Sequence, residues 1–133
     1  HARNRARRAG AARMLNLPTR IYFCTVPTDM RKSFDGLMRM TEAYLEQNVL
    51  DGGLFVFLNK KQDRIKLLYW DHDGLAIWYK RLEAGTYQRL SSPEGIHGLQ
   101  LSSTDLALLL QGIDLTSVQR RKRYQISEKV STS

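Results

Sequence analysis

Short runs of apolar, β-branched and aromatic residues recur between polar stretches of this chain, and their lengths are typical of β-strands. The first run is stopped by Pro27, which cannot donate to a sheet ladder. The second run is apolar at every position, as expected for a strand with both faces covered. The last run follows Gly85 as a short edge strand, and we expect residues 91–100 beyond it to form a surface loop. The five runs are residues 20–26, 54–58, 64–71, 75–82 and 87–90.

Two other segments show the three- and four-residue spacing of helices. The first follows a cap at Thr28 or Ser33, and Gly36 within it weakens the helix by roughly 1 kcal/mol relative to Ala, so we expect close packing there. The second follows the polar caps of residues 102–105 and ends at Gly112. The predicted buried positions are Phe34, Leu37, Met38, Thr41, Tyr44 and Leu45 in the first helix, and Leu106, Leu109 and Leu110 in the second.

Together these elements predict an α+β fold, an antiparallel β-meander of four to five strands with two covering helices. The chain has 133 residues, which is enough for one core but not for two. We expect a single α+β domain over residues 14–115. Residues 1–13 are expected to be a non-native or disordered leader, and residues 116–133 a basic, largely disordered tail.

The two central runs predict a β-hairpin whose turn permits two registers. A two-residue loop of Asp73 and Gly74 would set Trp70 opposite Ile77. A three-residue loop of residues 72–74, closed by a bulge at Gly74, would shift every partner by one. In both cases Gly74 is expected to supply the positive φ that such a turn needs.

One face of this hairpin combines cations with aromatic rings in either register. Arg64, Lys66 and Trp70 share that face, opposite to Ile65 and Leu67, because side chains alternate along a strand. A cation can neutralise a phosphate while a ring stacks on a base, so the face is a candidate nucleic-acid contact. The competing interpretation is that the rings belong to the core. The second strand adds Tyr79 and Arg81 in the first register, or Trp78 and Lys80 in the second.

The net charge of +8 comes from the ends of the chain. Residues 1–13 hold five arginines and no acid, and residues 120–123 add four cations, whereas residues 14–118 carry 11 cations and 12 acids. The block at 120–123 has no nearby acid to pair with, so phosphate contact is its expected use, with a solubilising tail as the alternative. Arg31 and Lys32 precede the first helix, whose N–H groups favour phosphate, unless Arg31 pairs with Asp35 on the outer face.

The remaining composition excludes several classes of protein. A single cysteine, Cys24, leaves no internal disulfide framework and agrees with a reducing cytoplasm, where we expect the protein to act. No stretch approaches the roughly 20 apolar residues that span a bilayer, so no membrane partner is expected.

Catalytic and metal-binding patterns are weak in this chain. Asp63, Asp71 and Asp73 are better explained as turn residues than as a Mg²⁺ site of a nuclease. His72 and His97 lack a second ligand at a spacing that suits zinc. There is no Gly-rich phosphate loop and no nucleophile elbow. We therefore expect no enzyme activity, no metal and no cofactor.

Several stretches, in collinear order over about residues 14–124, also resemble a known family. The chain is similar to the small accessory protein (TnpB type, second reading frame) of the bacterial insertion-sequence family numbered sixty-six, which is unrelated to the RNA-guided nucleases that share the TnpB label. The Trp-Asp-x-Asp-Gly and Trp-Tyr-Lys-Arg-Leu segments of the hairpin are specific. The resemblance implies a role in transposition beside a separate transposase. The matching residues are 27–37, 54–57, 64–83, 106–114 and 120–123.

The sequence thus predicts a non-catalytic accessory factor for insertion-sequence transposition that binds DNA, at the ends of the element or non-specifically, through the hairpin face and the basic tail. The alternative is an adaptor that docks on the transposase without touching DNA. The predicted contact residues are Arg31, Lys32, Arg64, Lys66, Trp70, Tyr79, Lys80, Arg81, Arg120, Arg121, Lys122 and Arg123.

Overall fold

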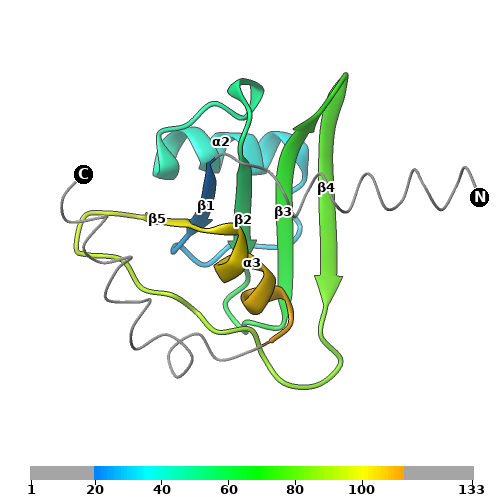
Figure 1. Cartoon of the computed structure of the whole chain (residues 1–133), viewed down its shortest axis with the longest axis vertical. Helices are drawn as coiled ribbons and strands as arrows, with labels where there is room; N and C mark the ends of the chain where they lie inside the picture. Colours follow the sequence, from blue (N-terminus) through cyan, green and yellow to red (C-terminus); the bar gives the residue numbers. More distant parts are fainter. Residues whose placement is uncertain (1–19, 113–133) are drawn as a thin grey trace, which may run out of the picture.

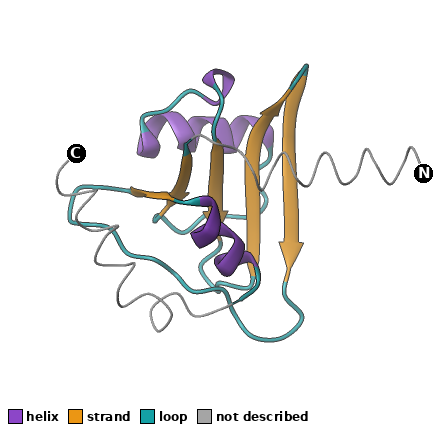
Figure 2. Ribbon diagram, viewed as in Figure 1, coloured by secondary structure: helices purple, strands orange, loops and turns teal. Residues whose placement is uncertain are grey.

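A five-stranded sheet in the order β4-β3-β2-β1-β5 forms the centre of the computed structural model, which describes residues 20–112 (Figure 1). One long helix and one short helix cover its two faces, as Figure 2 shows by colour. The α+β class, with five strands and two helices, is confirmed. The strands are β1 (Ile21–Cys24), β2 (Leu54–Leu58), β3 (Arg64–Asp71), β4 (Gly74–Arg81) and β5 (Gly98–Leu101); the helices are α2 (Phe34–Leu45), α3 (Ser103–Leu110) and the single 3-10 turn η1 (Val49–Asp51).

Strand β2 separates two apolar cores, one under each helix. Leu54, Val56 and Leu58 belong to the core beneath α3, whereas Phe55 and Phe57 belong to the core beneath α2. All five side chains are fully buried, which confirms the expectation of a strand covered on both faces.

The pairing of β1 with β2 corrects the expected antiparallel meander. These two strands run parallel, with Ile21 opposite Leu54, while every other pair in the sheet is antiparallel. The connection between them contains α2, which crosses one face of the sheet (Figure 1). A strand that returns through a crossover helix arrives in the same direction, whereas a short hairpin turn would reverse it.

The fifth strand lies elsewhere than expected. Residues 87–90 form no strand, and β5 occupies part of the predicted surface loop, where it pairs antiparallel with β1. Gly98 permits this pairing beside α2, because a Cβ there would approach Leu45 Cδ2 to 2.3 Å. Tyr87 is instead buried, and its backbone N–H donates to Gln62 O at 2.7 Å. The four-residue β5 is too short for its alternation to stand out in sequence.

Helix α2 begins at Phe34, with Ser33 as its N-cap, although the Ser33 side chain makes no capping hydrogen bond. Gly36 is closely packed as expected, since a Cβ there would lie 3.1 Å from Lys32 Cβ. Two positions expected to be buried are exposed, because they flank the stripe that contacts the sheet. These are Phe34 and Tyr44.

The hairpin turn adopts neither of the two expected registers. Asp71 lies opposite Gly74, so the loop consists of His72 and Asp73. His72, with φ of 64°, adopts the left-handed conformation that was expected of Gly74. The resulting register sets Lys66 opposite Tyr79.

Some expectations lie outside the described residues. The leader of residues 1–13, the tail of residues 116–133 and its cations Arg120, Arg121, Lys122 and Arg123 fall there, and so do the domain boundaries. Within residues 20–112, no helix is both long enough and apolar enough to cross a membrane.

Candidate nucleic-acid interface

The charged loops of the sheet meet at one of its ends. Because β1 and β2 are parallel and β3 and β4 form a hairpin, the ends of β1, β2 and β4 lie beside the start of β3, at the lower end in Figure 1. We call this the basic end, because its residues 25–33, 59–64 and 80–83 hold seven cations against the acids Asp29, Asp63 and Glu83. The cations are Arg31, Lys32, Lys60, Lys61, Arg64, Lys80 and Arg81.

The opposite end of the sheet has the reverse charge. It holds Asp51, Asp71 and Asp73 at η1 and the hairpin tip, with Arg20 at the start of β1. Residues 20–112 carry 11 cations and 11 acids in all. The fold therefore separates charge that cancels along the sequence.

The loop before α2 presents Arg31 at the basic end. Asp29 accepts hydrogen bonds from the Arg31 backbone N–H at 2.9 Å and from its guanidinium Nη2 at 2.7 Å. These bonds lower the pKa of Asp29 to about 2. Arg31 thus pairs with Asp29 rather than with Asp35, and it remains largely exposed.

Lys66 is buried and stabilises the fold, whereas a phosphate contact would be exposed on the surface as the sequence predicts. Its side chain is only 7% exposed, and its Nζ donates to Met30 O at 2.8 Å and to Lys32 O at 2.7 Å. The ammonium also lies 4.6 Å from the centre of the Tyr79 ring. Lys66 therefore fixes the Arg31 loop onto β3 and is not available to DNA.

The β2–β3 turn presents Lys60 and Lys61, which are not among the contact residues predicted from the sequence. Asn59 shapes the turn, because its Nδ2 donates to Asp63 Oδ1 at 2.6 Å and its Oδ1 accepts from the Arg64 backbone N–H at 3.0 Å. The bond from Asn59 also lowers the pKa of Asp63. The two lysines are exposed. Two consecutive lysines between strands were the signal that could have identified them.

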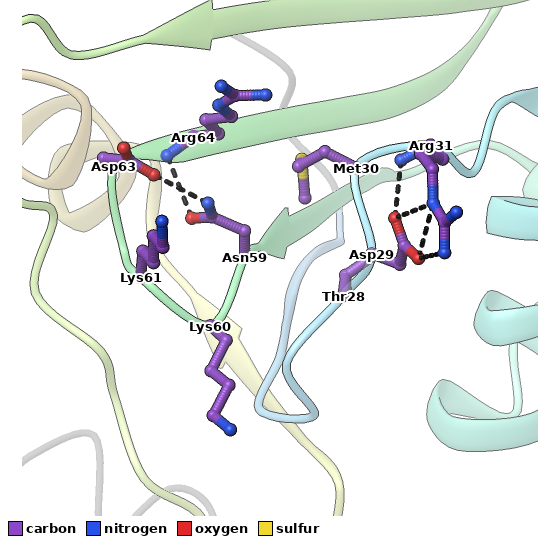
Figure 3. A pocket seen from close by; sticks show the side chains of 9 residues that line it. All are labelled: Thr28, Asp29, Met30, Arg31, Asn59, Lys60, Lys61, Asp63 and Arg64. Carbon is purple, nitrogen blue, oxygen red and sulfur yellow. Dashed lines mark hydrogen bonds and ion pairs between the residues drawn. The ribbon is translucent and has the colours of Figure 1, made fainter.

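A cleft of about 460 Å³ separates this turn from the Arg31 loop (Figure 3). Arg64 lies on one side and the Arg31–Asp29 pair on the other. Lys60 points away from the cleft into the open. The volume lies within the ordinary range of ligand sites, and the lining offers both cations and hydrogen-bond acceptors. The lining residues are Thr28, Asp29, Met30, Arg31, Asn59, Lys60, Lys61, Asp63 and Arg64.

The end of β4 adds a cross-strand pair of like charges. Arg64 and Arg81 are directly opposite each other, an arrangement that is unfavourable unless an anion lies near. Arg81 Nη2 is 2.9 Å from Glu83 Oε1, and this carboxylate raises the pKa of Arg81. The neighbouring Tyr79 is 47% exposed, so its ring is accessible beside these cations. Lys80 also lies at this end but on the other face of the sheet.

Trp70 does not join this group. It is 40% exposed but lies near the hairpin tip, six residues along β3 from Arg64, or about 20 Å at roughly 3.3 Å per residue. Leu68, between them on the same face, is buried. The expected face is thus confirmed in its membership, since Arg64, Lys66 and Trp70 share it with Tyr79 and Arg81. The exposed cations, however, gather at one end of it and Trp70 lies at the other.

Arg89 is half-buried next to the β2–β3 turn, where its guanidinium donates a hydrogen bond to the Asn59 carbonyl. Burial lowers the pKa of Arg89. Cys24 is fully buried, and burial raises the pKa of its thiol. Within residues 20–112, His, Cys, Asp and Glu form no group of three that could hold a metal ion.

Comparison with known proteins identifies one family. The family model described as IS66 Orf2 like protein matches residues 19–120. Uncharacterized protein y4jC of Sinorhizobium fredii is 33% identical over 102 residues, which make up 77% of this chain and 86% of the relative. Uncharacterized protein y4hO of the same organism is 35% identical over 95 residues, 71% of this chain and 81% of the relative. No solved structure matches the chain.

Proposed function

This chain belongs to the family of IS66 Orf2-like proteins, and from that membership we propose that it acts in transposition as a non-catalytic accessory factor that contacts DNA through its basic end. The observation that carries the proposal is the gathering of seven cations, from three separate segments, at one end of a fold whose residues 20–112 are neutral in total. Each cation that neutralises a phosphate releases counterions, which favours binding and makes it salt-dependent.

The charge separation also orients the protein on DNA. The end that carries Asp51, Asp71 and Asp73 is repelled by the phosphate backbone, so the basic end faces it. Tyr79 adds a ring that can stack on an unpaired base next to Arg64 and Arg81. The cations of residues 120–123 would strengthen the same attraction.

The positions of the carboxylates support the non-catalytic part of the proposal. Asp71 and Asp73 lie at the hairpin tip, at the far end of the sheet from Asp63 and Glu83. Asp63 accepts a hydrogen bond from Asn59, and Glu83 pairs with Arg81. We expect no DNA cleavage with Mg²⁺ or Mn²⁺, and nicking that Asp63→Asn abolishes would contradict this part.

A second candidate function is an adaptor that docks on the transposase. It is favoured by the exposed ring of Trp70, which lies near the hairpin tip, away from the cations of the basic end, and suits a protein interface. Co-purification with the transposase after nuclease treatment separates the two functions. A complex that survives nuclease and high salt favours the adaptor, whereas a complex that dissociates indicates that DNA held the two proteins together.

The proposed function is tested by fluorescence anisotropy of the full chain on duplexes from the ends of the element and on scrambled duplexes. We expect binding to both kinds of duplex, with affinity that falls steeply as salt rises. Absence of binding at low salt would remove the DNA contact from the proposal.

A further inference from the structure

The long outer edge of β4 has no partner strand among residues 20–112. The strand order places β4 at one edge of the sheet and β5 at the other. β4 has eight residues, each paired with β3 without a bulge, whereas β5 has only four. An edge of this length presents a row of backbone donors and acceptors that can pair with another strand.

The register identifies which backbone groups point outward. Leu82 N–H donates to Asp63 O, just beyond the end of the β3–β4 ladder. Because hydrogen-bonding direction alternates along an antiparallel strand, the even-numbered residues of β4 bond to β3. The odd-numbered residues direct their N–H and C=O groups outward, and these residues are Leu75, Ile77, Tyr79 and Arg81.

The side chains of this edge lack the usual protection against pairing. Residues 75–79 are five consecutive apolar or aromatic residues, partly or well exposed, with no proline or charge among them. In natural proteins, prolines, charged side chains or bulges commonly prevent an edge strand from pairing with another chain. Lys80 and Arg81 are the exception, and they stand only at the last two positions of the strand.

We propose that the open edge of β4 pairs antiparallel with β4 of a second copy of this chain, joining two sheets into one of ten strands. The charge separation selects this occupant and this direction. An antiparallel neighbour brings the acidic hairpin tip of one copy beside the basic end of the other. With Ile77 on the two-fold axis, Leu75 lies opposite Tyr79, and Asp73 lies beside Arg81 of the second copy.

A cysteine on the proposed axis tests the pairing directly. Ile77 of one copy would lie opposite Ile77 of the other in a hydrogen-bonded pair, where the Cα separation of about 5.5 Å suits a disulfide. Under mild oxidation of nucleic-acid-free full chain at high micromolar concentration, Ile77→Cys should form a covalent dimer quickly. Gln100→Cys, exposed on the other edge strand, serves as the control and should cross-link much more slowly. Native Cys24 is buried and should stay reduced in both.

A charge exchange tests the direction with substitutions at exposed positions. Asp73→Arg should weaken the dimer roughly tenfold in sedimentation equilibrium, because two attractive pairs per dimer become repulsive. Adding Arg81→Glu to Asp73→Arg should restore the dimer, since each pair is then complementary again. Circular dichroism confirms that the variants keep the fold.

Three outcomes would overturn the proposal. The first is a wild-type chain that stays monomeric while Ile77→Cys cross-links no faster than Gln100→Cys. The second is a dimer that cross-links through Gln100→Cys instead of Ile77→Cys. The third is a double variant whose dimer is no more stable than that of Asp73→Arg alone. The proposal does not depend on DNA binding, and every readout is taken without DNA.

Discussion

Lys66 shows how far a single residue can be predicted from its neighbours in sequence. Alternation correctly places it with Arg64 on the face opposite to Ile65 and Leu67. Its burial depends on a loop more than 30 residues away, whose carbonyls at Met30 and Lys32 accept its hydrogen bonds. No local pattern contains that information.

Replacing Lys66 tests its anchoring role. Lys66→Met keeps most of the side-chain stem but removes both donors, so we expect a loss of about 1–3 kcal/mol in the free energy of unfolding. Lys61→Met, at an exposed position, should change that free energy by about 0.5 kcal/mol or less. Urea denaturation compares the two variants. Equal stability of Lys66→Met and the parent would contradict the anchor.

The pair of Asp29 and Arg31 predicts a pH effect with a definite sign. The folded-state pKa of Asp29 is about 2, below its ordinary value of 3.8, so the pair stabilises the fold above pH 3.8 and this contribution is lost as pH falls toward 2. In Arg31→Ala, carboxyl titration by NMR should find the Asp29 pKa raised toward 3.8. A pKa that stays near 2 would show that another group holds it.

At the scale of elements, the sequence identifies those whose signals are local. The apolar run of β2 and the two strands of the hairpin are predicted correctly, because hydrophobic periodicity and β-propensity can be recognised within a few consecutive residues. The parallel pairing of β1 with β2 is not found, because it follows from the path of α2 across the sheet. The strand β5 is missed because Pro93 and Gly95 mark its region as loop and because only β1 pairs with it.

The caps of the two helices give an internal comparison. Ser102 caps α3 with its side chain, since the Asp105 N–H donates to Ser102 Oγ at 3.0 Å. Ser102→Ala should therefore lower the free energy of unfolding by about 1 kcal/mol. Ser33→Ala should have little effect, because the Ser33 side chain makes no capping bond to α2. Thermal denaturation of both variants measures the difference, and equal losses would contradict these cap assignments.

At the scale of the whole molecule, the separation of charge could not be predicted from the sequence. Its cations come from segments around Arg31, Lys60 and Arg81, each of which has acids nearby in the chain. Only the strand directions bring the cations to one end and leave Asp51 and Asp73 at the other. For the same reason the expected face of the hairpin has its exposed cations at one end and Trp70 at the other, since β3 extends from one charged end of the sheet to the other.

A dimer through β4 would have its two basic ends pointing in opposite directions, separated by roughly the 25 Å length of an eight-residue strand. It should therefore bridge two DNA duplexes. We expect a biotinylated duplex to retain a fluorescent one on streptavidin beads in the presence of the parent chain, and less so with Asp73→Arg. Binding of DNA without any bridging would contradict the predicted arrangement of the basic ends.

The central claim, that the basic end binds DNA, is tested most directly by two variants of equal net charge. Lys60→Gln with Lys61→Gln removes two cations from the basic end, whereas Arg20→Gln with Arg39→Gln removes two from elsewhere in the fold. Both variants keep the cations of residues 1–13 and 120–123. Fluorescence anisotropy over a range of salt should show weaker binding and a salt slope smaller by about two for the lysine variant, since about one unit is lost per phosphate contact. The arginine variant should match the parent in slope, and identical affinities and slopes for the two variants would contradict the claim.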